Sequence, residues 1–304
     1  MYHLATVFPP LRRVRLPLTR DQVMLLMAAV NEIFLGIDIY MAHSISGTIV
    51  PNEWIPIIFG PLAGLLLILA GLIALRRRSL ANVIANLVFL ASIAVGILGA
   101  YFHLRRAALP AGPLTGRLSV NLLVWAPPVL GPLTFSLTGW LGISAAWTED
   151  PPDSGTLVLL GGLRVHLPYS KTRAFFFITG LGTLATVISS VLDHARTNFV
   201  NPWLWVPTLA GIFGVVVAIT LAALDNPTRS DLIVYTATML LLIVVGVVGA
   251  YLHIRENLTA GGVVVTERFI RGAPVLAPLL YTNMGSLGLF ALLDPAERSG
   301  ASTP

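Results

Sequence analysis

Long apolar runs separated by short polar segments dominate this sequence. Eight runs are long enough for a membrane-spanning helix, which needs about 20 mainly apolar residues to cross the hydrocarbon core. They are residues 22–44, 54–75, 80–103, 119–146, 173–194, 203–224, 231–253 and 272–293. The pattern predicts an all-α polytopic membrane protein with eight transmembrane helices.

The fourth and eighth runs differ from the others because they contain prolines. Pro127, Pro128 and Pro132 lie in the fourth run, and Pro274 and Pro278 lie in the eighth. Proline has no backbone N–H and clashes with the preceding helical turn. We therefore expect these two helices to be kinked or to begin with a distorted turn.

One motif occurs twice, about half a chain apart. Residues 99–105 read Gly-Ala-Tyr-Phe-His-Leu-Arg, and residues 249–255 read Gly-Ala-Tyr-Leu-His-Ile-Arg. The proline-containing segments 126–135 and 273–281 also match each other. A duplicated unit of four helices keeps the same orientation in both copies. The sequence therefore predicts two parallel four-helix repeats, related by a pseudo-two-fold axis along the membrane normal.

This duplication divides the chain into five predicted segments. They are a cytoplasmic N-terminal arm (1–21), the first membrane repeat (22–146), a cytoplasmic linker (147–172), the second membrane repeat (173–293) and a cytoplasmic tail (294–304). Residues 155–167 of the linker suit a short hairpin. Each repeat carries its own helices and orienting charges, so we expect the linker to be dispensable for membrane insertion.

Composition supports the membrane assignment. The chain is 56% hydrophobic and only 11% charged, whereas soluble domains carry about 25% charged residues. The lipid bilayer is therefore an expected partner, and nucleic acid is not. The absence of cysteine excludes disulfides and thiolate metal sites.

The basic residues predict the orientation. With the N-terminus inside, twelve of the 19 Arg and Lys residues fall on the inner side, and loop 45–53 on the outer side has none. The positive-inside rule then favours a multi-pass protein with both termini in the cytoplasm, expected in a bacterial inner membrane. Six of the seven outer arginines fall in loops 104–118 and 254–271. We expect these two loops to contact protein partners.

Four histidines are the main candidates for chemistry. In the predicted topology, the outer ends of the first and third helices of each repeat carry His43, His103, His194 and His253. Imidazole is a good ligand for haem iron and for other metals. The histidines therefore predict a metal site holding haem b or another tetrapyrrole. Arg105 and Arg255, two residues beyond their histidines, suit pairing with its carboxylates.

Other interpretations of the histidines remain open. Histidine is amphipathic and tolerated at a bilayer interface, so duplication alone can explain four of them. Metal binding without a tetrapyrrole and proton chemistry are further alternatives. Within-repeat pairing, His43 with His103 and His194 with His253, is favoured because short connections favour neighbouring helices. Pairing across the repeats is the rival arrangement.

Glu32 and Asp38 are the carboxylates that lie well inside a predicted span. Their six-residue separation places them on different faces of a helix. They suit a proton or ion path, or pairing with a buried arginine of another subunit. The alternative is a protonated carboxyl group hydrogen-bonded between helices, for example near Asn31 or Asn86. The second repeat has Thr183 and Ser189 at the matching positions.

These observations favour one function over two others. The expected role is that of a membrane subunit of a respiratory or photosynthetic electron-transfer assembly, rather than that of an independent enzyme. The first alternative is a structural anchor for a peripheral partner. A small-solute or proton transporter is less favoured, because its helices should be broken at the midplane in both halves. The prolines of this chain lie instead near the outer starts of two helices.

The orientation generates a direct prediction. A single cysteine introduced into the turn 76–79 should resist membrane-impermeant thiol reagents in intact cells, because that turn is expected inside. A single cysteine in loop 45–53 is the control and should react. Labelling of the 76–79 turn from outside would overturn the orientation.

Overall fold

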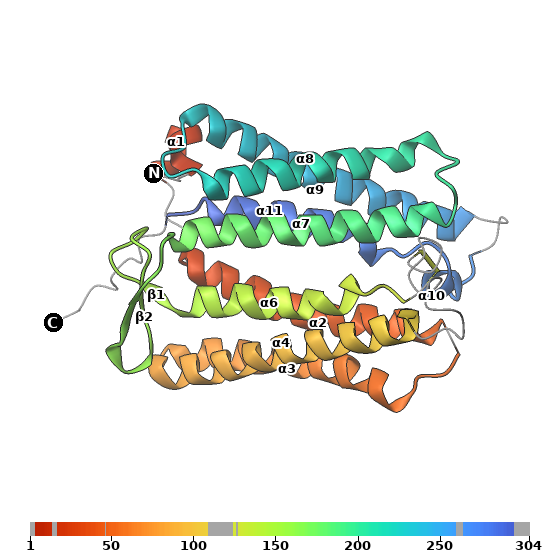
Figure 1. Cartoon of the computed structure of the whole chain (residues 1–304), viewed down its shortest axis with the longest axis horizontal. Helices are drawn as coiled ribbons and strands as arrows, with labels where there is room; N and C mark the ends of the chain where they lie inside the picture. The colour runs from red at the N-terminus through yellow and green to blue at the C-terminus, as the bar shows by residue number, and fades with distance from the viewer. Residues whose placement is uncertain are drawn as a thin grey trace.

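The computed structural model describes residues 4–13, 17–45, 47–108, 124–125, 127–259 and 264–294. Within these ranges, long helices run along one axis of the molecule (Figure 1). A small sheet lies at one end of this bundle, which we call the hairpin end. The opposite end, where His43, His103, His194 and His253 lie, is called the histidine end.

The helices alternate in direction between these two ends. The first half contains α1 (Leu4–Val7), η1 (Pro9–Arg13), α2 (Arg20–Ser44), η2 (Pro51–Glu53), α3 (Trp54–Ala74), α4 (Arg78–Ala108) and α6 (Leu130–Ala146). The second half contains α7 (Lys171–Ala195), η5 (Pro202–Leu204), α8 (Trp205–Ala223), α9 (Arg229–Thr259), α10 (Arg268–Arg271) and α11 (Leu276–Ala291).

Six of the described helices are long and apolar enough to cross a membrane: α2, α3, α4, α7, α8 and α9. The chain is therefore a helical membrane protein. Eight spanning helices were predicted, and six of them are candidates here, because α6 and α11 contain only 17 and 16 residues. Helices of this length extend about 25 Å, which is less than the hydrocarbon thickness of about 30 Å.

Local chemistry explains where two of the helices begin. Thr19 and Gln22 form a reciprocal capping box, so α2 begins at Arg20 rather than at the expected residue 22. Ser170 accepts a hydrogen bond from the Arg173 N–H, so α7 begins at Lys171 rather than at 173. Both helices therefore begin with charged residues that the apolar pattern had left outside them.

Two other helices are longer than expected. Helices α4 and α9 continue beyond the predicted ends at residues 103 and 253 to Ala108 and Thr259. His103 and His253 therefore lie inside helices rather than at their ends. Residues 109–123, which include most of loop 104–118 and the expected start of the fourth span, lie outside the described residues.

The prolines mark helix starts rather than kinks. Pro132 and Pro278 lie in the first turns of α6 and α11, where a backbone N–H has no partner within the helix. Trp203, expected to begin a span, lies in η5, and α8 begins at Trp205. Within loop 254–271, α10 forms a single short helical turn.

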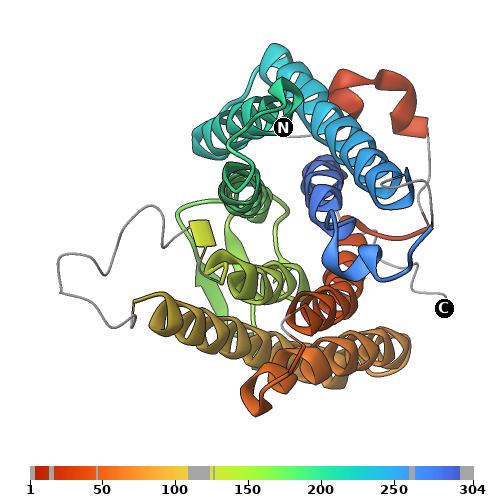
Figure 2. The ribbon, with the colours of Figure 1, turned by 90° about the vertical axis from the view of Figure 1, so that its right-hand side faces the viewer.

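Three layers make up the bundle. Helices α2, α6, α7 and α11 form a central ring, in which each contacts its two neighbours (Figure 2). Helices α3 and α4 cover one side of the ring, and α8 and α9 cover the other. The contacts of the two halves correspond. The pairs α2–α3, α3–α4, α4–α6 and α2–α6 match α7–α8, α8–α9, α9–α11 and α7–α11.

Segments outside the long helices join the halves at the hairpin end. Strands β1 (Thr148–Glu149), β2 (Thr156–Val158) and β3 (Arg164–His166) form an antiparallel sheet, and η4 (Leu160–Gly162) connects β2 to β3. Thr156 pairs with His166, which confirms the hairpin expected over 155–167. The N-terminal arm crosses to the second half, where the Leu4 N–H donates to the Leu292 carbonyl at 2.8 Å.

Close helix contact depends on small residues at matching positions. A Cβ atom added to Gly96 of α4 would lie 2.6 Å from the backbone nitrogen of Ser136. A Cβ atom added to Gly246 of α9 would lie 2.6 Å from the backbone nitrogen of Thr282. Glycine therefore allows α4 to approach α6, and α9 to approach α11, more closely than any other residue would.

This packing predicts the effect of a single methyl group. Gly96→Ala should lower the free energy of unfolding in detergent by about 1–3 kcal/mol, because backbone atoms must move to admit the methyl. Gly71→Ala in α3 is the control and should not destabilise, because no heavy atom lies within 4 Å of its added Cβ. Equal stability of the two variants would contradict the close α4–α6 contact.

Candidate functional site

The first-half histidines lie side by side at the histidine end. The ring centroids of His43 on α2 and His103 on α4 are 6.0 Å apart, with an angle of 29° between the ring planes. His103 Nδ1 lies 2.9 Å from the Pro128 carbonyl oxygen. His43 Nδ1 lies 3.3 Å from a carboxylate oxygen of Glu53 in η2. The two imidazoles are thus held by groups from different segments.

The second-half histidines have a related arrangement. His253 Nδ1 on α9 lies 2.8 Å from the Pro274 carbonyl oxygen, which matches the His103 contact. His194 on α7 is close enough to His253 for their charges to interact. The Nδ1 atom of His194 lies 3.5 Å from the Ser190 hydroxyl. Glu53 corresponds to Leu204 by the offset that relates His43 to His194, so no carboxylate stands there, and a backbone hydrogen bond links His194 to Leu204 instead.

The duplicated motif explains how His103 and His253 reach the prolines. Gly99 lies one turn before His103, and a Cβ atom added there would lie 2.7 Å from Pro132 Cβ. Gly249 has the same relation to Pro278, at 2.9 Å. The glycine brings its helix against the start of α6 or α11. The imidazole on the next turn can then bond to a carbonyl just before that start.

These hydrogen bonds define the tautomer of both residues. A carbonyl oxygen can only accept, so Nδ1 must donate, and the lone pair of a neutral imidazole lies on Nε2. Histidines that bind metals commonly have this arrangement, in which the Nδ1–H bonds to a carbonyl oxygen and Nε2 coordinates the metal. His103 and His253 are therefore oriented as a metal ligand would be, although the same bond also has a packing role.

In the first half, a neighbour of the expected arginine approaches the histidine pair. Arg105 and Arg255 are exposed, and no contact of Arg105 with a histidine is found in the described part of the chain. Arg106 instead approaches the His43 partner, with Nη1 3.9 Å from a Glu53 carboxylate oxygen. In the second half, Arg196 donates to the Val124 carbonyl at 3.0 Å.

Glu32 has a different partner from the asparagines proposed from the sequence. Its side chain is fully buried, and it forms a hydrogen bond with the Ser92 hydroxyl of α4. Ser92 Oγ also lies 2.9 Å from the Phe135 carbonyl oxygen of α6. Asn31 pairs instead with Asn283 at 2.8 Å, and Asn86 donates to the Asn82 carbonyl at 2.7 Å.

The geometry around Ser92 favours a neutral Glu32. A serine hydroxyl has one proton, and the Phe135 carbonyl can only accept it. A carboxylic acid proton on Glu32 can then be donated to Ser92 Oγ, so both bonds form. An ionised carboxylate in a membrane-spanning helix would be far more costly.

Asp38 lies apart from Glu32, as their helical spacing predicted. It is close enough to Asp193 of α7 for the two carboxyl groups to repel each other when charged. Asp193 also pairs with Arg196, at 3.5 Å. Two carboxyl groups, one on α2 and one on α7, therefore lie near each other toward the histidine end.

Two cavities among the described residues lie away from the four histidines of the histidine end. One, of 270 Å³, is at the hairpin end and is lined in part by Asp153, His166, Arg173 and Asp225. The other, of 340 Å³, lies between α4 and α6 beside Ser136 and Trp140. Across the described ranges, no group of three or more His, Asp or Glu side chains is arranged to hold a metal ion.

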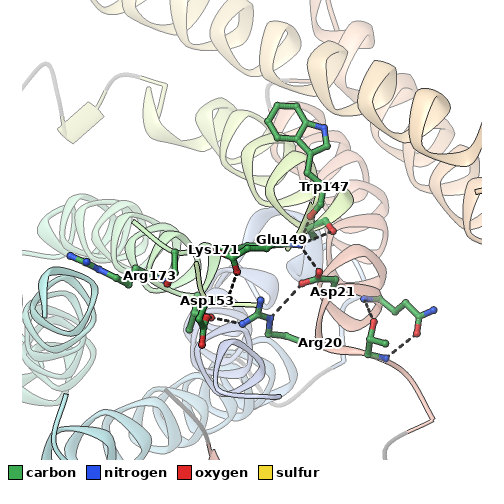
Figure 3. A network of polar contacts seen from close by, with 12 residues as sticks. Arg20, Asp21, Trp147, Glu149, Asp153, Lys171 and Arg173 are labelled. Atoms are coloured by element: carbon green, nitrogen blue, oxygen red, sulfur yellow. Dashed lines mark hydrogen bonds and ion pairs between the residues drawn. The ribbon is translucent and has the colours of Figure 1, made fainter. Parts of the chain in front are cut away.

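A buried ionic network at the hairpin end was not predicted from the sequence. Figure 3 shows that it joins the first turns of α2 and α7 to the segment that contains the sheet. Lys171 donates to the Asp21 carboxylate and also contacts the Trp147 carbonyl. Arg20 donates to Thr172, lies 3.5 Å from Asp21 and stacks over the Phe175 ring at 5.2 Å.

The sheet segment contributes the remaining charges. Glu149 accepts hydrogen bonds from the backbone N–H groups of Lys171, Gly155 and Asp153, at 2.9, 2.8 and 3.0 Å. A carboxylate at this place also interacts favourably with the positive N-terminal end of α7. The Thr172 hydroxyl donates to the Asp153 carboxylate. Removing one partner of a buried ion pair typically costs about 3–5 kcal/mol.

One signal in the sequence could have revealed this network. Residues 18–21 read Leu-Thr-Arg-Asp, and residues 169–172 read Tyr-Ser-Lys-Thr, with the offset that separates His43 from His194. Each segment has a capping residue followed by a cation. Lys171 is the single lysine of the chain.

Comparison with protein-family models, with curated proteins and with solved structures finds no match for this chain. The described fold and the apolar character of six of its helices define the class of protein as a helical membrane protein. Its function is therefore argued from the side chains themselves.

The Glu32–Ser92 contact predicts a measurable coupling. Ser92→Ala should lower the free energy of unfolding by about 1–3 kcal/mol, because it leaves the buried Glu32 carboxyl group without its partner. In a Glu32→Leu background the same substitution should cost less, because that carboxyl group is already gone. Denaturant unfolding of the four proteins measures the difference. An equal cost of Ser92→Ala in both backgrounds would contradict the contact.

Proposed function

We propose that this protein is an integral membrane subunit of an electron-transfer assembly, and that it holds a haem or another tetrapyrrole at its histidine end. One observation carries the proposal: the 6.0 Å separation of the His43 and His103 rings. Two imidazole nitrogens that each lie about 2 Å from one metal ion leave the ring centres about 6 Å apart. A bound tetrapyrrole would supply one-electron chemistry.

The residues of the chain would act on such a group in defined ways. The Pro128 and Pro274 carbonyls orient His103 and His253, leaving Nε2 as the ligand atom. The Glu53 carboxylate lies 3.3 Å from His43 Nδ1 and would help to orient this ring. Arg106 lies beside Glu53 and is placed to pair with a carboxylate of the bound group, a role expected of Arg105 from the sequence alone.

We also propose a membrane arrangement for the bundle. The eight long helices form two parallel four-helix repeats, and the shorter α6 and α11 belong to the central ring. The hairpin end lies in the cytoplasm of a bacterial cell. The matched helix contacts of the two halves support the repeats. The distribution of arginines supports the orientation. Protein partners then bind at the histidine end, over loops 104–118 and 254–271.

A structural membrane anchor without a cofactor is the second candidate. It is favoured by the hydrogen bonds of His103 and His253, because these bonds already fix α4 against α6 and α9 against α11. A transporter is less well supported. The six candidate spanning helices run without a break through the described residues, whereas midplane breaks characterise many transporters.

The visible absorption spectrum of the purified protein separates these functions. Expressed in haem-replete cells, the protein should carry a Soret band. His103→Ala and His253→Ala should each reduce that band, and the double variant should abolish it without loss of membrane insertion. His166→Ala is the matched control, because this histidine lies in β3 at the hairpin end.

Two results would reject the haem-binding role. A colourless wild-type protein from haem-replete cells would favour the structural anchor. A Soret band that survives in the double variant would show that these histidines are not the ligands.

A further inference from the structure

The buried network at the hairpin end connects helices that belong to different halves. Helices α2 and α7 lie across the central ring from each other, and each is flanked by α6 and α11 (Figure 2). At their first turns, however, side chains from α2 and α7 bond directly to each other (Figure 3). This contact is a second connection between the halves, in addition to helix packing.

The contact is reciprocal. Arg20 donates to Thr172, the residue after Lys171, and Lys171 donates to Asp21, the residue after Arg20. Each cation thus donates to the residue that follows the equivalent cation on the opposite helix. This is the pattern that a two-fold axis generates when it passes between two equivalent helix ends. The network therefore lies where the two halves would move against each other.

The segment between the halves closes the network from one side. Glu149 binds the first N–H of α7 and two N–H groups of its own segment, and Asp153 accepts from Thr172. This segment therefore does more than link the two halves, and its expected dispensability for membrane insertion stays a prediction. This segment supplies two carboxylates and the Trp147 carbonyl to the contact between the halves.

We propose that this network is an ionic clamp that holds the two halves of the bundle together at the hairpin end, with residues 147–172 as its strap. Separation of α2 from α7 at this end must break both reciprocal bonds at once. The clamp fixes the hairpin end as the pivot of any movement between the halves. The proposal does not depend on whether the histidines bind a cofactor.

The distance between the starts of α2 and α7 tests the clamp. The chain has no cysteine, so Leu18→Cys and Tyr169→Cys provide two unique spin-labelling sites. These matched positions precede the capping residues and are 41% and 42% exposed. In otherwise unchanged protein, pulsed electron resonance should give one narrow distance distribution. Lys171→Gln should shift it toward longer distances and broaden it.

Two further variants keep the test decisive. Thr172→Val removes one hydroxyl with little change of shape and should also shift the distribution, even if Lys171→Gln fails to fold. Arg173→Gln is the matched control. Arg173 lies on the same turn but bonds to Asp225 and to the carbonyls of Ala222 and Ala223, within the second half. It should leave the distribution unchanged.

Two outcomes would overturn the clamp. One is an unchanged distribution in both Thr172→Val and Lys171→Gln. The other is a shift in Arg173→Gln as large as theirs, because this would reflect general loosening of the start of α7.

Discussion

Unpaired charge is costly in the interior of the bundle, and this constraint organises its hairpin end and its middle. Inside a membrane, polar groups must find partners within the protein. Lys171 is almost completely buried and is satisfied by Asp21 and a backbone carbonyl. Glu32 has no cation nearby among its described contacts, and it bonds instead to a serine hydroxyl. Charges are thus paired at the hairpin end, whereas the middle of the bundle holds a group that can be neutral.

The two halves share a scaffold but differ in what they bury. Glycines at matching positions bring α4 onto α6 and α9 onto α11, and each glycine-containing motif places a histidine against a proline carbonyl. Glu32 and Ser92, however, correspond to Thr183 and Leu242 in the second half. The two halves therefore have corresponding helix contacts but different buried polar groups.

The sequence predicts the features that depend on local pattern. Apolar run lengths locate the helices, but no sequence pattern predicted the hydrogen bonds of His103 and His253 to the proline carbonyls. Capping residues shift the starts of α2 and α7, a local effect that an apolar pattern alone misses. The short α6 and α11 reflect the position of their prolines. The ionic network could not be predicted this way, because Asp21 and Lys171 are 150 residues apart and meet only after both halves have packed.

Electron cryo-microscopy of the purified protein, with its native cofactors retained, can show whether a group is bound at the histidine end. We expect density for a bound group between His43 and His103, with His103 bonded to the Pro128 carbonyl. We also expect the two halves to superpose by a two-fold rotation about an axis along the membrane normal. Histidine rings that point separately into lipid or water, with no density between them, would rule out a cofactor at this site.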